Sequence, residues 1–251
     1  MASTVLVTGA AGAIGSATVR ALRAEGRRVV GLDKEPAPPD SGAADWIEQD
    51  LFDTPATERV LAESPLLAGL QHVVAVAGGP TDEEVGRLDP AEVPVDVFAA
   101  SVTLNLVAQY AIVRAGAERI EAETPSGDRS ITLFSSINAV RGYGMPGYSA
   151  AKAGLLGLLV ALALPLGRRG LRINAVTPGT VITERFRETY GDVGEKLSRR
   201  LLEASASTRA TRAEDVARGV VAVLGLEQMT GQHVVIDGGQ LAVPFDRYPL
   251  A

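Results

Sequence analysis

Short apolar runs rich in β-branched residues alternate along the chain with longer segments of helical periodicity. The runs that predict strands are Thr4–Thr8, Val29–Asp33, His72–Val76, Ser130–Ser135, Arg172–Val176 and Val234–Asp237. The helical patterns cover Ile14–Glu25, Val95–Glu121, Gly154–Leu164 and Ala213–Leu224. Because several strands are almost wholly apolar, we expect them to be buried on both faces. The pattern therefore predicts an α/β fold, a doubly wound parallel sheet of about seven strands with helices on both faces, in three α/β/α layers.

The whole chain, 1–251, is predicted to form one domain. Its 251 residues, 46% of them hydrophobic, suffice for one sizeable core. An apolar strand pattern begins at Val5, which leaves no room for an export signal after Met1. The longest apolar run, Ala153–Gly167, is shorter than the roughly 18–20 residues that cross a bilayer and contains Pro165, so we expect a buried helix and no membrane contact.

Charge and composition narrow the range of partners. The formal net charge of −6, with both signs scattered, provides no basic face and argues against nucleic acid. The chain has no cysteine, so it forms no disulfide or thiolate metal site, and a reducing, cytoplasmic setting is expected. His72 and His233 have no partner at ligand spacing, so no metal site is expected.

A glycine-rich turn follows the first predicted strand. It reads Thr8-Gly9-Ala10-Ala11-Gly12-Ala13-Ile14-Gly15 and leads directly into a helix. Small residues let the backbone approach a pyrophosphate, and the helix N-terminus offers unpaired N–H groups and a partial charge of about +0.5. Taken alone, the turn also fits a strand–helix connection without a ligand, but its context favours a dinucleotide.

Two acidic residues follow predicted extended segments. Asp33 ends the second strand, where a carboxylate can accept hydrogen bonds from both ribose hydroxyls and repels a 2′-phosphate, which predicts NAD(H) rather than NADP(H). Lys34 could soften this preference, although neighbouring strand residues point to opposite faces. Asp50 is a candidate for an adenine contact, or, being close to Asp53, for a helix cap.

Candidate proton-transfer residues follow the fourth predicted strand along the chain. Ser135 and Ser136 end this strand, and Tyr148 and Lys152 share one helix face at i, i+4 spacing. An ammonium near the phenol favours the phenolate, and lowering the tyrosine pKa by ~3 units corresponds to about 4 kcal/mol. The phenol would then exchange a proton with an alcohol or alkoxide held by a serine hydroxyl. Alone, such a pair also fits a surface contact, but the serines and the glycine turn favour chemistry.

With these motifs the chain resembles the short-chain dehydrogenase/reductase family from Val5 to Gly239, in its single-domain branch with a Rossmann fold. The resemblance implies four catalytic residues, which are Asn105, Ser136, Tyr148 and Lys152. It implies contacts to NAD(H) from Gly9, Ala11, Gly12, Ala13, Ile14, Gly15, Asp33, Asp50, Leu51, Ala77, Gly78, Asn105, Tyr148, Lys152, Pro178, Gly179, Val181 and Thr183. It also implies a substrate-covering segment at about 183–205, with pocket walls from Asn138, Tyr143 and Phe186.

The chain departs from the family pattern at several positions. Ala13 replaces a common glycine, so the turn also fits the spacing of larger, epimerase-like relatives. The segment Ala75-Val76-Ala77-Gly78 lacks the usual asparagines. Ser136 lies one residue closer to Tyr148 than is common, which leaves Ser135 as an alternative, although alignment from the strand favours Ser136. Pro165 is expected to kink or end the catalytic helix.

The expected activity is NAD(H)-dependent interconversion of a secondary alcohol and a ketone on a small-molecule substrate. Arg141 or Arg187 would recognise an anionic group on it, or be solvated. An epimerase- or dehydratase-like enzyme and a catalytically idle NAD-binding regulator are the alternatives. The segment Ala153–Leu164 is apolar around its whole circumference, which favours a partner subunit over cover by the chain's own neighbouring helix. The resemblance implies a homo-oligomer, a tetramer more often than a dimer.

Overall fold

The computed structural model describes residues 3–85, 89–141, 144–184, 186–188, 196, 198–199, 202–203 and 205–243. Within these residues seven parallel strands form one sheet in the order β3-β2-β1-β4-β5-β6-β7. The strands are β1 (Thr4–Thr8), β2 (Arg28–Asp33), β3 (Asp45–Glu48), β4 (Leu70–Ala75), β5 (Ser130–Phe134), β6 (Arg172–Pro178) and β7 (His233–Ile236). The chain winds from β1 to one edge of the sheet and then from β4 to the other, so the predicted doubly wound architecture is confirmed.

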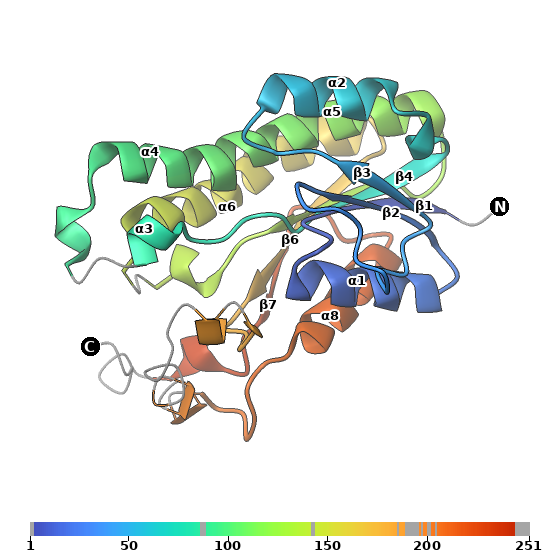
Figure 1. Ribbon diagram of the computed structural model, residues 1–251. Coiled ribbons are helices and arrows are strands. Elements are labelled where there is room, and N and C mark those ends of the chain that lie inside the picture. The colour runs from blue at the N-terminus through green and yellow to red at the C-terminus, as the bar shows by residue number, and fades with distance from the viewer. Residues whose placement is uncertain are drawn as a thin grey trace.

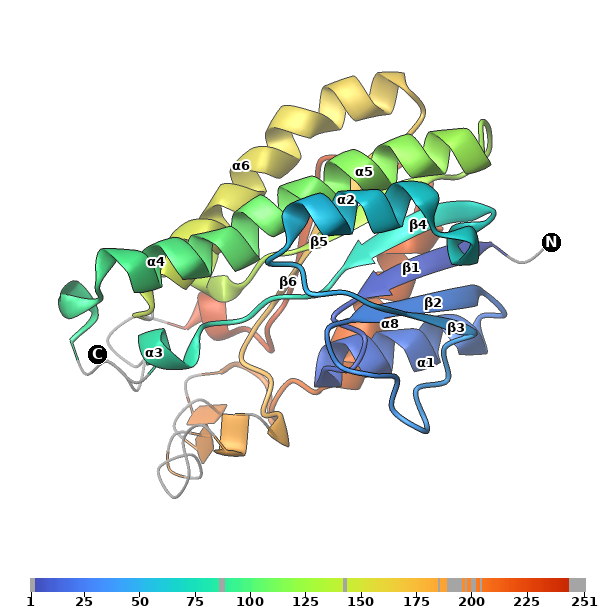
Figure 2. The same cartoon turned by 45° about the horizontal axis from the view of Figure 1, so that its top comes forward.

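Helices cover both faces of this sheet (Figures 1 and 2). One layer contains α1 (Ala13–Ala24) and α8 (Ala213–Gly225), which pack against each other. The opposite layer contains α2 (Thr54–Glu63), α4 (Val95–Val102), α5 (Ala108–Glu123) and α6 (Pro146–Arg168). Shorter elements are α3 (Asp82–Val85), η1 (Pro65–Leu67), η2 (Pro90–Glu92), η4 (Ile137–Ala139) and η5 (Gln240–Ala242). The three predicted layers are therefore present.

Each face of the sheet has its own hydrophobic core. Successive strand residues point to opposite faces, so Leu6 joins the core under α2, α5 and α6, whereas Val5 and Val7 join the core under α1 and α8. Burial on both sides explains the uninterrupted apolar runs, and the six predicted strands match the observed ones to within two residues at each end. Helix α2 has no predicted counterpart, because only Thr57 and Leu61 on it are buried.

A π-helical segment, η3 (Thr103–Val107), joins α4 to α5. The sequence pattern predicts one uninterrupted helix here, and hydrophobic periodicity does not reveal the wider turn. Asn105 lies inside η3 and is fully buried. Such π-turns are rare and occur frequently at functional sites.

Helix α6 continues past Pro165 to Arg168, so of the two expected outcomes, a kink or an end at the proline, the end does not occur and the kink stays a prediction. Pro165 lies in the last turn, where its missing N–H removes one backbone hydrogen bond. The helix is thus longer than the apolar run in the sequence. By length and composition both α6 and Val95–Glu123 could cross a membrane, a test that core helices of soluble proteins also pass. Both helices pack on the sheet through residues such as Ile112 and Leu159.

Two apolar side chains on the outer face of α6 are exposed. Val160 is 71% exposed and Leu164 is 63% exposed. The predicted cover of this face by a partner subunit stays a prediction.

Candidate active site

The β1–α1 turn forms a cradle of glycine and alanine residues. Gly9 has φ +65°, and a Cβ added to Gly15 would collide with the carbonyl oxygen of Gly9. Gly12 is the N-cap of α1 without a side-chain cap, and the first turn contains no acidic residue. The start of α1 thus keeps backbone N–H groups for an anion, and the glycines let it approach closely. These features fit the pyrophosphate of a dinucleotide.

Asp33 is tied to this cradle at the end of β2. Its Oδ2 accepts a hydrogen bond from the backbone N–H of Ala11 at 2.9 Å, and its Oδ1 accepts one from Glu35 N at 3.2 Å. A carboxylate has about four acceptor positions, so two remain for ribose hydroxyls. Lys34 is exposed and pairs with Glu35 at 3.9 Å.

The contacts of Asp50 and Leu51 give little support for a cofactor site. Asp50 is exposed and accepts a hydrogen bond from Phe52 N at 3.0 Å, while Asp53, not Asp50, caps α2 by accepting from Ala56 N at 2.9 Å. The side chain of Leu51 is buried in the core under α2. A cofactor contact at these positions stays a prediction.

The loop after β4 is held by two buried amides. Asn105 accepts from Gly79 N and donates to Gly79 O, both at 2.9 Å, and Gln109 donates to Ala77 O at 2.8 Å. Gly78, between them, has no room for a side chain, because a Cβ would lie 2.6 Å from Asn105 Oδ1. Asn105 and Gln109 thus support a loop that lacks the usual asparagines. The sequence gives no signal for Gln109, because its partner is remote in the chain.

The two serines after β5 point in different directions. Ser135 is buried and donates to Lys152 O at 2.9 Å, so its hydroxyl faces the helix backbone. Ser136 accepts from Asn138 N at 3.2 Å, and its single proton can go to Asn138 Oδ1 at 3.4 Å or to the Tyr148 phenol; the hydrogen bond with the phenol lowers the phenol pKa. Of the two, Ser136 is the serine that meets the tyrosine.

Tyr148 and Lys152 meet at the start of α6. The Nζ of Lys152 lies 5.6 Å from the centroid of the Tyr148 ring and donates to Phe134 O at 2.8 Å. Burial lowers the pKa of Lys152 to about 7. A Cβ on Gly78 would lie 3.2 Å from this Nζ, so the amine also adjoins the loop after β4.

The expected lowering of the phenol pKa is not found. Burial raises the pKa of Tyr148, the hydrogen bond with Ser136 acts in the opposite direction, and the Glu84 carboxylate adds to the rise. The physical reason is that Lys152 is itself desolvated and directs its Nζ to a backbone carbonyl. At neutral pH the residue is therefore a protonated phenol.

The predicted nicotinamide-side residues follow β6. Gly179 N donates to Ile236 O at 2.9 Å, and a Cβ on Gly179 would lie 2.6 Å from Gln240 Oε1. Val181 packs on the core under α8, and the Thr183 hydroxyl accepts from Phe186 N at 3.1 Å. Pro178 closes β6, so this set is contiguous with the carboxyl end of the sheet. Their predicted contact with the cofactor stays a prediction.

The predicted substrate wall is described only in part. Tyr143 and much of 183–205 lie outside the described residues. Asn138 lies beside Ser136, and its Nδ2 is buried without a hydrogen-bond partner. Arg141 donates to Gln240 O at 3.3 Å and Leu241 O at 2.9 Å in η5, so it is not simply solvated, and its recognition of an anionic group stays a prediction. The side chain of Arg187 is exposed.

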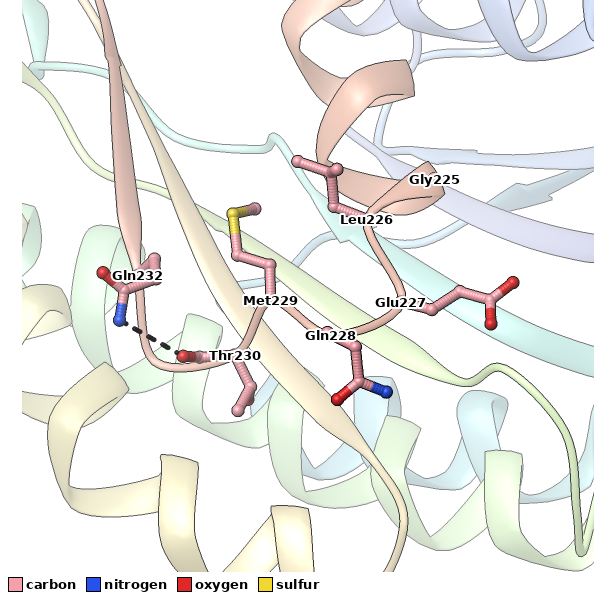
Figure 3. Close-up of a pocket in the computed structure, with 7 residues that line it drawn as sticks. All are labelled: Gly225, Leu226, Glu227, Gln228, Met229, Thr230 and Gln232. Carbon is pink, nitrogen blue, oxygen red and sulfur yellow. Dashed lines mark hydrogen bonds between the residues drawn. The ribbon is translucent and has the colours of Figure 1, made fainter.

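A separate pocket lies near the amino end of β7 (Figure 3). It is lined by Gly225, Leu226, Glu227, Gln228, Met229, Thr230 and Gln232, between the end of α8 and the start of β7. No predicted site residue lines it. Across the described ranges, no group of three or more His, Cys, Asp or Glu side chains is placed to hold a metal ion.

Comparison with known proteins places these features in a family. Residues 9–240 match the family model described as enoyl-(acyl carrier protein) reductase. An L-rhamnose 1-dehydrogenase (NAD(P)(+)) of Azotobacter vinelandii is 30% identical over 94% of this chain and 95% of its own length. A probable galactose dehydrogenase of Rhizobium meliloti is 30% identical over 94% and 93%. A crystal structure of an oxidoreductase from Burkholderia thailandensis, of the short-chain dehydrogenase/reductase family, superposes with a TM-score of 0.83 at 31% identity, covering 96% of this chain and 94% of the other.

Fold and comparisons together define an oxidoreductase of the class that uses a nicotinamide cofactor. The chain belongs to the short-chain dehydrogenase/reductase family.

Proposed function

We propose that this chain is an NAD(H)-dependent oxidoreductase that interconverts a secondary alcohol and a ketone, with Tyr148 as the proton-exchanging group. One observation carries the proposal. The Tyr148 phenol is hydrogen-bonded to Ser136 and adjoins Lys152, and these residues lie at the carboxyl ends of the strands, as the glycine cradle does. The bound nicotinamide would supply the hydride acceptor or donor.

The chain's own residues would then manage the proton. Ser136 orients the substrate oxygen against the phenol, and Tyr148 Oη gives a proton to that oxygen in reduction or takes one in oxidation. Because burial raises the Tyr148 pKa, the protonated phenol is ready for reduction at neutral pH, whereas oxidation should accelerate as pH rises. Lys152 has a pKa of about 7, so it can release and take up the proton that Tyr148 exchanges. Asn105 supports this proton route by holding the loop after β4 in place.

The test compares Tyr148→Phe with Tyr110→Phe, a matched change at a half-exposed tyrosine on α5. A panel of secondary alcohols, ketones and sugars is followed by NADH absorbance; sugars belong in it because the two relatives are named for them. Tyr148→Phe should lower kcat by about 10²–10⁴-fold, and Tyr110→Phe should not. Equal turnover in both variants would refute the role of Tyr148. Conversion without net change in NADH would instead favour the epimerase- or dehydratase-like alternative, and NADH binding without any turnover would favour the regulator.

We propose NAD(H) over NADP(H) because Asp33 lies at the end of β2, against the cradle. A carboxylate there repels a 2′-phosphate. Asp33→Ala should improve the relative use of NADPH by about tenfold or more, since like-charge juxtaposition costs several kcal/mol. Glu35→Ala, an exposed neighbouring acid, is the control. A wild-type enzyme that prefers NADPH would overturn this assignment.

We also propose a cytoplasmic homo-oligomer, a tetramer or a dimer. The exposed Val160 and Leu164 on α6 support burial against a second copy. The lack of cysteine suits a reducing compartment. Sedimentation of wild type against Val160→Lys would show whether this face holds subunits together.

A further inference from the structure

Helix α3 carries a buried carboxylate against the start of α6. The side chain of Glu84 is on the short helix that follows the β4 loop, and the residue is only 2% exposed. Its Oε1 accepts hydrogen bonds from Gly147 N at 2.6 Å and from Tyr148 N at 3.1 Å. Figures 1 and 2 show α3 beside the beginning of α6. A carboxylate 63 residues away in sequence thus closes two open N–H groups in the first turn of the helix that carries Tyr148.

The contact is tight on every side. A Cβ on Gly147 would lie 2.9 Å from Phe98 O, 2.9 Å from Ser101 Cβ and 3.2 Å from Glu84 Oε1. The other carboxylate oxygen, Oε2, is buried without a hydrogen-bond partner, and so is the hydroxyl of Ser101. No ion pair to Glu84 is found in the part of the chain that the structure describes. The N–H groups of the helix start favour the charge on Oε1, but the buried and unpaired Oε2 makes this acid costly to keep.

We propose that Glu84 is a positioning residue for the reaction, whose carboxylate anchors the first turn of α6 and sets the electrostatic environment of the Tyr148 phenol. This inference rests on the proposed function, because it assigns a purpose to the placing of Tyr148. The backbone bond to Tyr148 N holds the residue itself, so loss of Glu84 would displace the phenol relative to Ser136.

The charged groups around the phenol come from separate elements. Lys152 lies behind the ring on α6, Ser136 hydrogen-bonds to the phenol from the end of β5, and Glu84 approaches from α3. Asp82 and Glu83 on α3, and Asp96 on α4, are exposed, so water screens their charges more. The Glu84 charge raises the Tyr148 pKa, which keeps the phenol protonated and delays the phenolate that oxidation needs.

Three variants separate the anchoring of α6 by Glu84 from the effect of its charge. Glu84→Gln keeps an oxygen acceptor for both N–H groups but removes the charge, whereas Glu84→Ala removes both. Glu83→Gln, at an exposed residue on the same helix, is the control. The pH profile of alcohol oxidation is measured with saturating NAD. In Glu84→Gln its rising limb should move to lower pH with kcat at the plateau nearly kept, because the phenolate forms more readily. In Glu84→Ala kcat should fall by about tenfold to a hundredfold with KM changed little, and Glu83→Gln should match wild type.

A second readout does not need turnover. NMR of protein with isotope-labelled tyrosine, with Tyr148→Phe in each background to identify the signal, follows the Tyr148 phenol through its titration. A lower phenol pKa in Glu84→Gln than in Glu83→Gln supports the proposal even if no substrate has been found. Unchanged titration in Glu84→Gln, together with an unchanged kcat in Glu84→Ala, would overturn it. Activity that survives Tyr148→Phe while the Glu84→Gln titration still moves would refute the proposed function and leave the electrostatic role of Glu84 intact.

Discussion

The two ends of the sheet differ in how most of their buried polar groups are paired, and the exception at the amino end is the unpaired Nε of Arg119 near the end of α5. At the amino ends of the strands, Arg172 donates to Asp128 at 2.8 and 3.0 Å and to the carbonyls of Leu224 and Met229. Arg129 donates to three carbonyls, and His72 pairs with Ser130 at 2.9 Å. At the carboxyl ends, Lys152 Nζ donates to Phe134 O, and polar atoms of Glu84 and Asn138 are buried without a partner.

This difference separates stability from chemistry. Fully paired buried groups hold one conformation, and removing a partner is costly. Buried groups with spare hydrogen-bonding capacity are costly to keep but available to a ligand or to a proton. We therefore expect substitutions at the amino end to change stability and those at the carboxyl end to change turnover.

The largest effect is expected at Lys152. Lys152→Met should lower kcat by about 10²–10⁴-fold, because the proton route loses its amine. Burial lowers the Lys152 pKa from 10.5 to about 7, so the unfolded chain binds this proton more tightly. The buried ammonium therefore lowers the free energy of unfolding by its full amount below pH 7. This loss becomes smaller as the pH rises from 7 toward 10.5.

The Met variant should accordingly be more stable than wild type at neutral pH, by about 1–3 kcal/mol, with a smaller gain at alkaline pH. Urea unfolding at both conditions measures this, with the exposed Lys34→Met as the control. A variant less stable than wild type at neutral pH would contradict the comparison.

Arg172 should show the reverse behaviour. Arg172→Met takes a donor from Asp128 and from the Leu224 carbonyl, while Met229 O keeps its hydrogen bond from Asn174, so the free energy of unfolding should fall by about 2–4 kcal/mol. The kcat of the folded fraction should stay within about twofold, because the site lies at the other end of the sheet. Arg168→Met, at an exposed arginine on α6, is the matched control. A large drop in kcat without a loss of stability would break the division between the two ends.

His72 should affect stability only in acid, so its effect is absent at neutral pH. Burial, together with the positive charge of Arg27, lowers the His72 pKa from 6.5 to about 4. The neutral ring therefore contributes stability above pH 6.5, which is lost as pH falls through 4, by about 3 kcal/mol in total. His72→Gln should flatten the decline in stability between pH 6.5 and 4.

His233→Gln, at an exposed histidine on β7, should leave that decline unchanged. Equal acid sensitivity in both histidine variants would show that another group causes it.

The predictable part of the site consists of short-range features. The glycine turn, Asp33 at the end of β2, and the Tyr148–Lys152 pair depend on neighbours within one strand–turn–helix unit or one helical turn, so their spacing is visible in the sequence. Gln109, Glu84 and the Arg141 contact depend on partners 32, 63 and about 100 residues away, where no periodicity applies. Whether Ser135 or Ser136 meets Tyr148 depends on the direction of the two side chains, and the sequence does not determine that direction.

The sequence by itself determined the layered sheet, its strand positions and the cradle of the first turn, because alternation of apolar residues and backbone freedom at glycine are local properties. Only the tertiary structure decided the ionisation of the site. The pKa of Tyr148 is raised, not lowered, because it depends on burial and on charges brought together from α3, α6 and the end of β5. Desolvation comes from everything packed around a group, and most of that packing is distant in sequence.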